Sequence, residues 1–519
     1  MPTAPDARPD ADLVTADDVG PPRRVVDRVD PVLVAVVVAG VVLRWVGLGA
    51  QSLWYDEWLT SEAVAGSLPD LFRHVAHREG IPPTYFVVEW AWVRLAGDGE
   101  VALRTLSALF GAATVPVAYA VVAELRQPRA AARGAAVLVA VSPMLVWYSQ
   151  EARPYSLIAL LGAVSFLLFA RVWRDDAPRH LAVWAAVAAA TVAVHYFAAF
   201  LIATEGLALL ARRPPQWRRL LLAALPSAGV LALLAPMAVT QHSHDANRLW
   251  ISGFPLGDRL EEAGRSALVG PSPVHGRLWI AVAAVVAVAA VALVGSGDRA
   301  ARSAAALAAG VGGAALVPPL VLAAAGGDDV VVGRYLVASL VPLVAAVAIG
   351  LAAGPRAVGL PALAVASAVS LVVVVGVRRD PDLQKPDWDA VAAAGDGGGR
   401  RALVLGNHRS IASPLVDYVT GGVSLEGDDR ALVDEVAVVS ARPSAKPCNF
   451  LVGRACALVF LGAPLPEATA AQLELVERVE LDQFVVERFR APDGPVSVGR
   501  ADLVDPQRLD DALVVVEPE

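Results

Sequence analysis

Long apolar stretches separated by short basic segments fill most of the chain up to residue 377. Many of them have about 17 or more residues with few charges, the length at which a helix crosses the hydrocarbon core of a bilayer. The pattern predicts a polytopic α-helical membrane domain over residues 31–377, with about eleven spanning helices by this length criterion. The expected spans are residues 31–49, 101–124, 134–147, 156–172, 181–196, 197–211, 220–240, 277–295, 304–325, 335–353 and 357–377.

Arginine is distributed unevenly among the loops between these spans. It precedes the first span and then recurs in every second loop, and loops rich in Arg and Lys stay on the cytoplasmic side. The N-terminus is therefore expected inside and everything after Val377 outside, with the polar residues 1–30 forming a disordered cytoplasmic segment. The arginines that decide this are Arg23, Arg24, Arg28, Arg126, Arg129, Arg133, Arg171, Arg174, Arg179, Arg212, Arg213, Arg218, Arg219, Arg299, Arg302 and Arg356.

The first outer loop, residues 50–100, is large and contains one ambiguous segment. Residues 82–95 are apolar enough to suggest another span, but they are short, open with two prolines and contain Glu89 and Arg94. A crossing there would put every later basic loop outside. We therefore expect this segment, like the amphipathic pieces 57–66 and 69–78, to lie on or dip into the outer leaflet as a juxtamembrane helix.

The composition changes after residue 377. Residues 378–519 contain β-like apolar runs separated by Gly, Pro and Asp, a pattern typical of strands and turns. We expect a small extracytoplasmic α/β or α+β domain here. Cys448 and Cys456 within it could form a disulfide or could both be small buried side chains. The expected strands are residues 402–405, 436–439, 457–460, 484–486 and 512–516.

Composition agrees with a membrane protein. Of the 519 residues, 56% are hydrophobic and 18% charged, whereas about 25% charged residues are usual in soluble proteins. The net charge of -8 argues against nucleic acid as a partner. The sequence has no glycine-rich loop of the kind that cradles nucleotide phosphates.

Ionisable and aromatic residues gather at the side of the membrane that the arginine pattern assigns as outer. Asp56 and Glu57 lie between the rings of Trp54, Tyr55 and Trp58, directly after the first span. Polar groups at membrane depth are expensive and usually mark a site or a path. The other members of this set are Tyr55, His77, Tyr85, Gln150, Glu151, Arg153, Tyr155, His195, Tyr196, Arg334, Tyr335 and Lys385.

These residue types suit transfer of a sugar from a lipid-linked sugar phosphate. Arg153, Arg334 and Lys385 could neutralise the departing phosphate, while a carboxylate removes the proton of an acceptor hydroxyl. No cofactor is certain. A divalent cation is one option, and its candidate ligands are Glu151, His77 and His195.

Plainer interpretations exist for each feature. An Asp-Glu pair at a helix exit is often a solvated boundary, His195 could be a packing residue, and Arg153 or Arg334 could extend to lipid headgroups. Arg104 and Glu205, both within spans, could form a buried structural pair or belong to unrelated contacts. A transporter or flippase of lipid-linked sugars is the main functional alternative, disfavoured because few ionisable residues lie at mid-depth. A sensor or scaffold would leave most of the helices unexplained.

Several motifs together resemble a known family. Leu53-Trp54-Tyr55-Asp56-Glu57, His77 before Pro82-Pro83-Thr84-Tyr85-Phe86, the run 102–111 (ALRTLSALFG) and the run 147–155 (WYSQEARPY) are similar to motifs of bacterial GT-C glycosyltransferases. The superfamily is that of protein O-mannosyltransferases and aminoarabinose transferases. His195-Tyr196-Phe197, Arg334-Tyr335 and Lys385-Pro386-Asp387-Trp388 resemble its later landmarks, so the likeness covers roughly residues 30–390.

The resemblance implies a GT-C fold in a bacterial cytoplasmic membrane and a polyprenyl-phosphate sugar donor. It also implies that transfer usually inverts the configuration at the anomeric carbon. The catalytic aspartate would be Asp56, and a second functional acid would lie near Glu151. Mannose or arabinose is the suggested sugar, and the acceptor would be a hydroxyl of a glycan, lipid or protein. Spacing alone does not separate Asp56 from Glu57 as the base.

Overall fold

The computed structural model describes residues 30–175, 177–243, 251, 254–271, 276–325, 331–397, 399–406, 409–442 and 464–517. The disorder expected for residues 1–30 therefore lies almost entirely outside the described residues. So do Cys448, Cys456 and the strand expected at 457–460.

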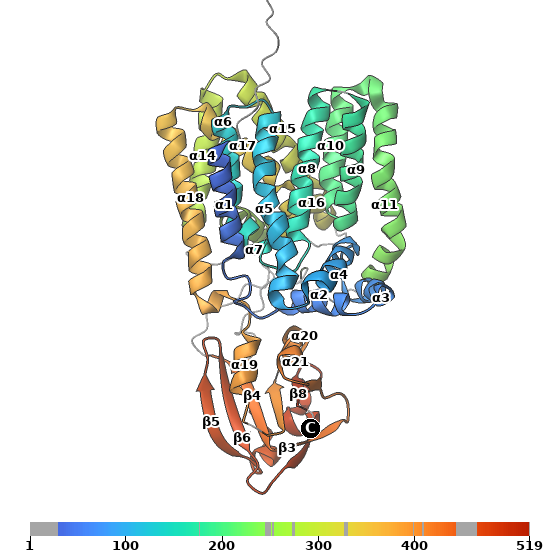
Figure 1. Ribbon diagram of the computed structural model, residues 1–519, viewed down its shortest axis with the longest axis vertical. Coiled ribbons are helices and arrows are strands. Elements are labelled where there is room, and N and C mark those ends of the chain that lie inside the picture. Colours follow the sequence, from blue (N-terminus) through green and yellow to red (C-terminus); the bar gives the residue numbers. More distant parts are fainter. Residues whose placement is uncertain are drawn as a thin grey trace, which may run out of the picture.

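A helical body and a smaller β-containing domain make up the chain (Figure 1). The long helices of the body run roughly side by side, and the last of them leads into the second domain. The helices of the body are α1 (Pro31–Trp45), α5 (Glu100–Glu124), α6 (Arg129–Val141), α7 (Pro143–Tyr148), α8 (Tyr155–Arg174), α9 (Pro178–Val194), α10 (Ala198–Arg212), α11 (Trp217–Ser243), α14 (Leu278–Gly295), α15 (Arg299–Ala314), α16 (Val317–Ala324), α17 (Leu340–Ala353) and α18 (Arg356–Arg379), with the 3-10 helices η2 (Pro214–Gln216) and η3 (Gly333–Ser339).

The predicted fold class is confirmed. Every expected span coincides with a helix or with a pair of consecutive helices. Six helical segments among the described residues are long and apolar enough to cross a membrane, and α1, α9 and residues 337–353 are shorter apolar helices. The spans expected at 134–147 and 304–325 are each divided, into α6 and α7 and into α15 and α16. The chain is a multi-pass membrane protein.

The segment predicted as the first outer loop forms three short helices: α2 (Tyr55–Ala65), α3 (Leu68–Arg78) and α4 (Thr84–Ala96). They lie at the end of the helical body that faces the β-domain, as Figure 1 shows. Ser67 starts α3 through a capping box with Asp70, and Pro83 immediately precedes α4. The segment 82–95 is therefore a juxtamembrane helix, as expected, and the later helices keep their predicted order through the body.

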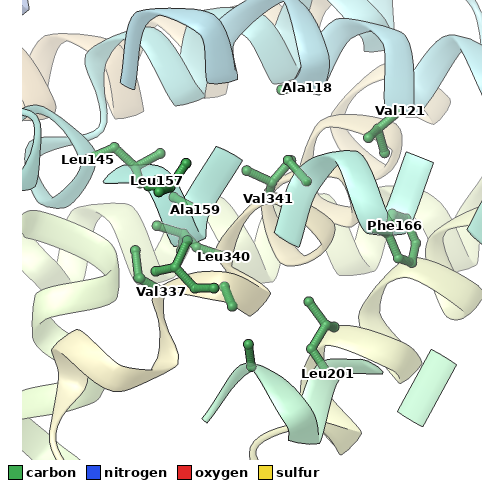
Figure 2. Packing of buried hydrophobic residues seen from close by; sticks show 14 of the residues in the cluster. Ala118, Val121, Leu145, Leu157, Ala159, Phe166, Leu201, Val337, Leu340 and Val341 are labelled. Carbon is green, nitrogen blue, oxygen red and sulfur yellow. The ribbon is translucent and has the colours of Figure 1, made fainter. Parts of the chain in front are cut away.

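Helix α8 is central to the body and positions the later site residues. It packs against α5, α9 and η3, and Figure 2 shows its Leu157, Ala159 and Phe166 among side chains from neighbouring elements. Val337 of η3 and Val341 of α17 belong to the same buried cluster. The 3-10 helix η3 is thus held by apolar packing against the middle of the protein.

The C-terminal domain is built on a six-stranded sheet of order β2-β8-β1-β4-β6-β5. β1 and β4 are parallel and the other pairs antiparallel. Alternate side chains of β1 and β4 enter two separate buried clusters, as expected for strands covered on both faces. The strands are β1 (Arg401–Leu405), β2 (Val423–Ser424), β3 (Arg430–Val433), β4 (Glu435–Ala441), β5 (Glu474–Glu480), β6 (Phe484–Arg490), β7 (Val496–Gly499) and β8 (Leu513–Val516).

Four of the strands predicted from apolar runs are confirmed, as β1, β4, β6 and β8. The others were not predicted: β2, β3 and β7 have only two to four residues each, and β5 is an exposed edge strand that reads ELVERVE. Short helical elements complete the outer part of the chain: α13 (Leu256–Val269), η4 (Pro381–Leu383), α19 (Trp388–Ala394), α20 (Arg409–Ala412), α21 (Leu415–Tyr418), α22 (Glu467–Ala470), α23 (Arg500–Leu503) and η7 (Pro506–Arg508).

The β-domain contacts the body at the loop that follows α1. The backbone N–H of Leu53 donates to the Tyr418 hydroxyl at 2.7 Å, and that hydroxyl donates to the Glu100 carboxylate. The N–H of Asp389 donates to the hydroxyl of Ser52 at 3.3 Å. These bonds fix the segment that leads into Asp56 and Glu57.

Candidate functional site

Asp56 and Glu57 lie in the first turn of α2, where negative charge interacts favourably with the helix dipole. Neighbouring positions on a helix point in different directions. The Glu57 side chain is fully buried, whereas the side chain of Asp56 is 18% exposed. The structure therefore distinguishes two carboxylates that the sequence pattern treats alike.

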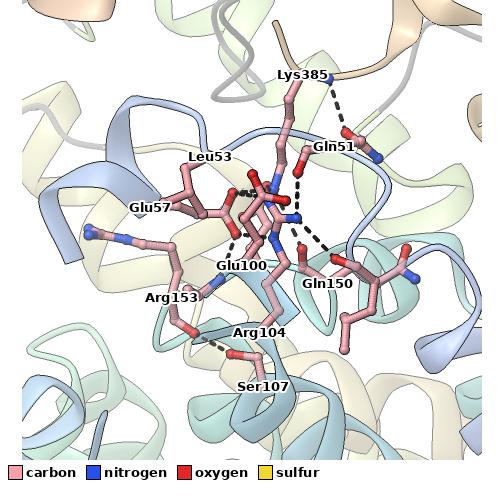
Figure 3. Close-up of polar contacts among 12 residues, drawn as sticks. Gln51, Leu53, Glu57, Glu100, Arg104, Ser107, Gln150, Arg153 and Lys385 are labelled. Carbon is pink, nitrogen blue, oxygen red and sulfur yellow. Dashed lines mark hydrogen bonds and ion pairs between the residues drawn. The ribbon is translucent and has the colours of Figure 1, made fainter. Parts of the chain in front are cut away.

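Glu57 is the centre of a buried charge network (Figure 3). Arg104 donates from Nε to Oε1 and from Nη2 to Oε2, both at 2.8 Å. Lys385 Nζ donates to Oε2 at 2.8 Å, and the N–H of Ala152 donates to Oε1 at 2.9 Å. Burial by itself raises the pKa of Glu57, but the charges of Arg104 and Lys385 outweigh it and hold the pKa at about 2.

Arg104 also fixes the backbone ahead of α2. Its Nη1 donates to the carbonyls of Leu48 and Gln51, and its Nη2 to that of Ser52. The alternative pairing with Glu205 is wrong. Glu205 instead accepts hydrogen bonds from Ser165 at 2.6 Å and from Trp184 at 2.8 Å. Arg104 and Glu205 therefore belong to unrelated contacts, which was the other possibility that the sequence allowed.

Lys385 reaches the network from the linker between η4 and α19. Its Nζ lies 3.8 Å from Oε1 of Glu151 and 3.5 Å from the carbonyl oxygen of Gln150. Burial raises the pKa of Glu151 to about 7, with Lys385 opposing and Glu57 and Asp56 adding to the rise. The side chain of Gln150 is used elsewhere, because it donates to the last carbonyls of α1.

Arg153 is buried, and its Nη1 and Nη2 atoms both donate hydrogen bonds to protein groups. It forms a two-pronged pair with Glu79, at 2.7 and 2.9 Å. Its Nη1 also donates to the Asp56 carbonyl at 3.0 Å and to the Thr60 hydroxyl at 3.2 Å. No sequence pattern pointed to Glu79, because a charged residue just beyond an amphipathic helix is ordinarily solvated.

Arg334 approaches Asp56 from η3. Its Nη1 lies 3.2 Å from Oδ2 of Asp56. The next residue, Tyr335, packs its ring against His195 at 5.2 Å and against Phe197 at 5.0 Å between centroids. The Asp56 carboxylate and the Arg334 guanidinium are thus in direct contact, and the Asp56 carboxylate remains partly exposed.

A cavity of about 430 Å³ is lined by Tyr335, the residue after Arg334, but by neither Arg334 nor Asp56. Tyr335 and His195 form part of its wall, and most other wall residues are apolar. The Nδ1 atom of His195 accepts from the N–H of Phe197 at 3.2 Å, which leaves the proton of the neutral ring on Nε2. The remaining wall residues are Gly80, Ile81, Tyr196, Phe197, Phe200, Ala238, Val239, Gln241, His242, Pro319 and Leu322.

Other predicted site residues lie at the edges of this arrangement. His77 is exposed on α3 and its Nδ1 contacts the Arg73 carbonyl oxygen at 2.8 Å. Tyr85 is buried against Ser107, with 3.4 Å between their hydroxyl oxygens. The remaining three contact neighbouring side chains: Tyr55 stacks on Trp58, Tyr155 packs on Tyr148, and Tyr196 donates to Gln241 at 3.0 Å.

The metal hypothesis gains no support from the donor set. Within the described ranges, no three His, Cys, Asp or Glu side chains come close enough to hold a metal ion. Glu151, His77 and His195 are accordingly not brought together as ligands. The groups that are brought together are Asp56, Glu57, Glu151, Arg153, Arg334 and Lys385, joined through direct contacts or through their mutual charge interactions.

Comparison with known proteins finds one family model that matches part of this chain. Residues 81–240 match the sequence model of a family described as dolichyl-phosphate-mannose-protein mannosyltransferase. The match covers less than half of the chain and includes Glu151, Arg153 and His195. It confirms the resemblance that the motifs indicated. A comparison with curated proteins finds no match.

Three solved structures are similar in outline. ArnT from Cupriavidus metallidurans bound to undecaprenyl phosphate is 14% identical, with a TM-score of 0.46 over 72% of this chain and 67% of that one. The Pmt1-Pmt2 complex of S. cerevisiae bound to its sugar donor is 18% identical, with a TM-score of 0.32 over 41% and 33%. EmbB, an arabinosyltransferase of Mycobacterium smegmatis, is 15% identical, with a TM-score of 0.38 over 75% and 34%. All three scores are below 0.5, so these likenesses carry no argument about the site.

Proposed function

We propose that this protein, whose residues 81–240 match a family of lipid-phosphate-dependent mannosyltransferases, transfers a sugar from a polyprenyl-phosphate donor to an acceptor hydroxyl. The observation that carries the proposal is the contact between Asp56 and Arg334, 3.2 Å apart at one end of the helical body. The reaction needs a base for the acceptor and a cation for the phosphate, and this contact supplies one of each.

Asp56 is the proposed general base. Glu57 is fully buried and bonded to Arg104, Lys385 and Ala152, so it has no free lone pair facing an acceptor. Asp56 keeps a partly exposed carboxylate in the same helical turn. We therefore assign Glu57 to positioning α2 and the proton transfer to Asp56.

Arg334 is the proposed phosphate ligand. Arg153 and Lys385 were expected to share this task, but the charge of Arg153 is matched by Glu79 and that of Lys385 by Glu57. Arg334 pairs with the Asp56 carboxylate, which is partly open to its surroundings. A phosphodiester could take the place of Asp56 on the guanidinium through a bidentate contact.

The cavity beside Tyr335 suits the apolar part of such a donor. Its walls are largely aliphatic and aromatic, and they include Tyr335, the residue that follows Arg334. His195, whose Nε2 carries the ring proton, is a polar residue in this wall. A polyprenyl chain would lie against apolar helices while its phosphate contacts Arg334.

The reaction then proceeds by direct displacement. The acceptor O–H bond breaks and its proton moves to Asp56, while the acceptor oxygen bonds to the anomeric carbon. The bond from that carbon to the phosphate oxygen breaks, and its electron pair stays on the phosphate. Attack opposite the leaving group inverts the anomeric configuration.

The site is assigned to the outer face of a bacterial cytoplasmic membrane. The basic segments at the start of α6, α9 and α15 lie at the end of the body opposite the β-domain. By the excess of arginine in cytoplasmic loops, that end is inside. The β-domain, Asp56 and Arg334 are then outside.

The test is transfer by purified protein in lipid nanodiscs. Donors are polyprenyl phosphates carrying labelled mannose or arabinose, acceptors are cell-wall glycan, lipid and peptide fractions, and the readout is released polyprenyl phosphate. Asp56→Asn should lower the rate by roughly 10²-fold or more, whereas Asp98→Asn, at an exposed loop residue of the same face, should not. Wild-type rates in Asp56→Asn, or no release from any donor, would refute the proposal.

A further inference from the structure

Helix α13, in the loop between α11 and α14, brings a further carboxylate, that of Glu262, to η3. Arg259, Glu262 and Ser266 lie three and four residues apart on one face of this helix and are all buried. That face packs against η3, the element that carries Arg334. Arg259 fixes the contact, since its Nε donates to the Phe254 carbonyl at 3.0 Å and its Nη1 to the Val331 carbonyl at 3.3 Å.

Glu262 faces the backbone next to Arg334. Its Oε1 accepts a hydrogen bond from the Ser266 hydroxyl. A Cβ atom placed on Gly333 would lie 3.6 Å from Oε2 of Glu262 and only 3.3 Å from the Cα of Ala263. Glycine at 333 therefore lets η3 approach α13 closely, and one oxygen of Glu262 points at the residue that precedes Arg334.

The charged and titratable groups around Glu262 come from few elements. Arg334 of η3 interacts electrostatically with Glu262 and forms an ion pair with Asp56. Tyr148 of α7 interacts with Glu262, Glu151 and Arg334, and Arg265 lies on α13 itself. The faces of α14 and α18 that meet α13 contribute apolar side chains, among them Leu278, Trp279, Val282, Val369 and Val373.

Glu262 holds a proton for much of the time near neutral pH. Burial raises the pKa of Glu262 to about 7, and the Ser266 hydroxyl and the charges of Arg334 and Arg265 offset only part of the rise. Ser266 occupies Oε1, so a proton on Oε2 is free to be donated. A general acid is most effective when its pKa lies near the working pH.

We propose that Glu262 is the general acid of this site and gives its proton to the lipid phosphate as the phosphate leaves the sugar. This inference rests on the proposed transfer reaction. Asp56 takes the acceptor proton while the carbon–oxygen bond to phosphate breaks with its electron pair on oxygen. The proton of Glu262 moves to that oxygen, so a lipid phosphate monoanion departs. Asp56 is then protonated and Glu262 ionised, and exchange with water restores both.

Arg334 contacts Asp56 and interacts electrostatically with Glu262, so it connects the two carboxylates. A phosphodiester that displaces Asp56 from Arg334 brings its negative charge toward Glu262 and favours the protonated form of that carboxyl. The same contact releases the Asp56 carboxylate for the acceptor. Donor binding would thus prepare both the acid and the base.

The decisive variant is Glu262→Gln, which keeps the shape and the acceptor for Ser266 but has no acidic proton. The expected result is a fall in kcat of about 10²-fold with little change in donor KM. The decline of wild-type kcat above pH 7 should also be absent. Glu261→Gln is the matched control, because Glu261 is the exposed neighbour that pairs only on the surface with Arg265; its kinetics should not change.

Two measurements separate this role from a structural one. Binding of polyprenyl phosphate, the product, should be the same in Glu262→Gln and in wild type if α13 still holds Arg334. Glu262→Asp, which keeps an acid, should be slow but should retain the alkaline decline. Unchanged kcat in Glu262→Gln, a raised KM with an unchanged pH profile, or loss of the decline in Glu262→Asp would each overturn the proposal.

The failures of the two proposals are distinguishable. If wild type is active and Asp56→Asn is inactive, an unaffected Glu262→Gln removes only the acid role. If wild type releases no polyprenyl phosphate from any donor, the proposed transfer fails and the acid role falls with it.

Discussion

Arg104 holds Glu57 through two parallel hydrogen bonds, from Nε to Oε1 and from Nη2 to Oε2, each 2.8 Å long. This pair lies beneath Asp56, the residue before Glu57 in the same helical turn. One carboxylate of the Asp-Glu pair is therefore buried and fixed, whereas its neighbour Asp56 stays partly exposed.

Glu57→Gln should destabilise the protein strongly. The substitution removes one charge and leaves two buried cations, Arg104 and Lys385, without their shared partner. Breaking a buried pair in this way costs about 3–5 kcal/mol. Thermal unfolding in detergent measures it, and Asp98→Asn, at an exposed loop residue, is the comparison because it should leave the transition temperature nearly unchanged. Equal stability of the two variants would contradict the assignment.

Acid should weaken the same network. The pKa of Glu57 is lowered to about 2 in the folded protein, whereas a glutamate in an unfolded chain has a pKa of about 4.3. A lowered pKa stabilises the folded state above the unfolded pKa, and this contribution disappears as the pH falls toward 2. The transition temperature of the wild type should fall below pH 4.5, and that of Glu57→Gln should fall less. Parallel curves would rule out this contribution.

Much of the architecture was accessible from the sequence. Spanning helices need apolar runs of nearly fixed length, so eleven helical regions and the juxtamembrane character of residues 82–95 could be predicted. The buried strands of the C-terminal domain could also be predicted, because their sequences are apolar runs. Edge strand β5, with its repeated glutamates, has no apolar pattern and was not found.

The site was predicted as a set of residues but not as a set of contacts. The arginine pattern put Asp56, Glu151, Arg153 and Arg334 on one face of the membrane. It could not show that Glu79 matches Arg153 or that Lys385 enters from another domain, because partners distant in sequence are fixed only by packing. Glu262 was missed because its helix lies in a polar loop.

Tyr418→Phe should loosen the β-domain from the membrane body. The variant removes the acceptor of the Leu53 N–H and the donor to Glu100. A buried N–H left without a partner costs about 1–3 kcal/mol. Amide exchange at Leu53 should therefore accelerate by about 10- to 100-fold.

The control for this loosening is Tyr119→Phe. The Tyr119 hydroxyl donates to Asp30 at 3.2 Å, at the opposite end of the body, so its removal should leave exchange at Leu53 unchanged. If both variants or neither accelerate exchange, the Tyr418 contact does not hold the loop before Asp56.

Gly162→Ala should reduce activity by displacing Arg334. A Cβ at position 162 of α8 would lie 2.5 Å from the carbonyl oxygen of Ala338, which is backbone of η3 and cannot rotate away. Overpacking of this kind costs about 1–3 kcal/mol, and η3 must shift to relieve it. A displacement of about 1 Å at a reacting group can lower the rate by 10²-fold, so kcat should fall far more than the transition temperature. Gly229→Ala on α11, where a Cβ meets no atom within 4 Å, should leave both unchanged, and equal kcat in the two variants would show that η3 does not depend on this contact.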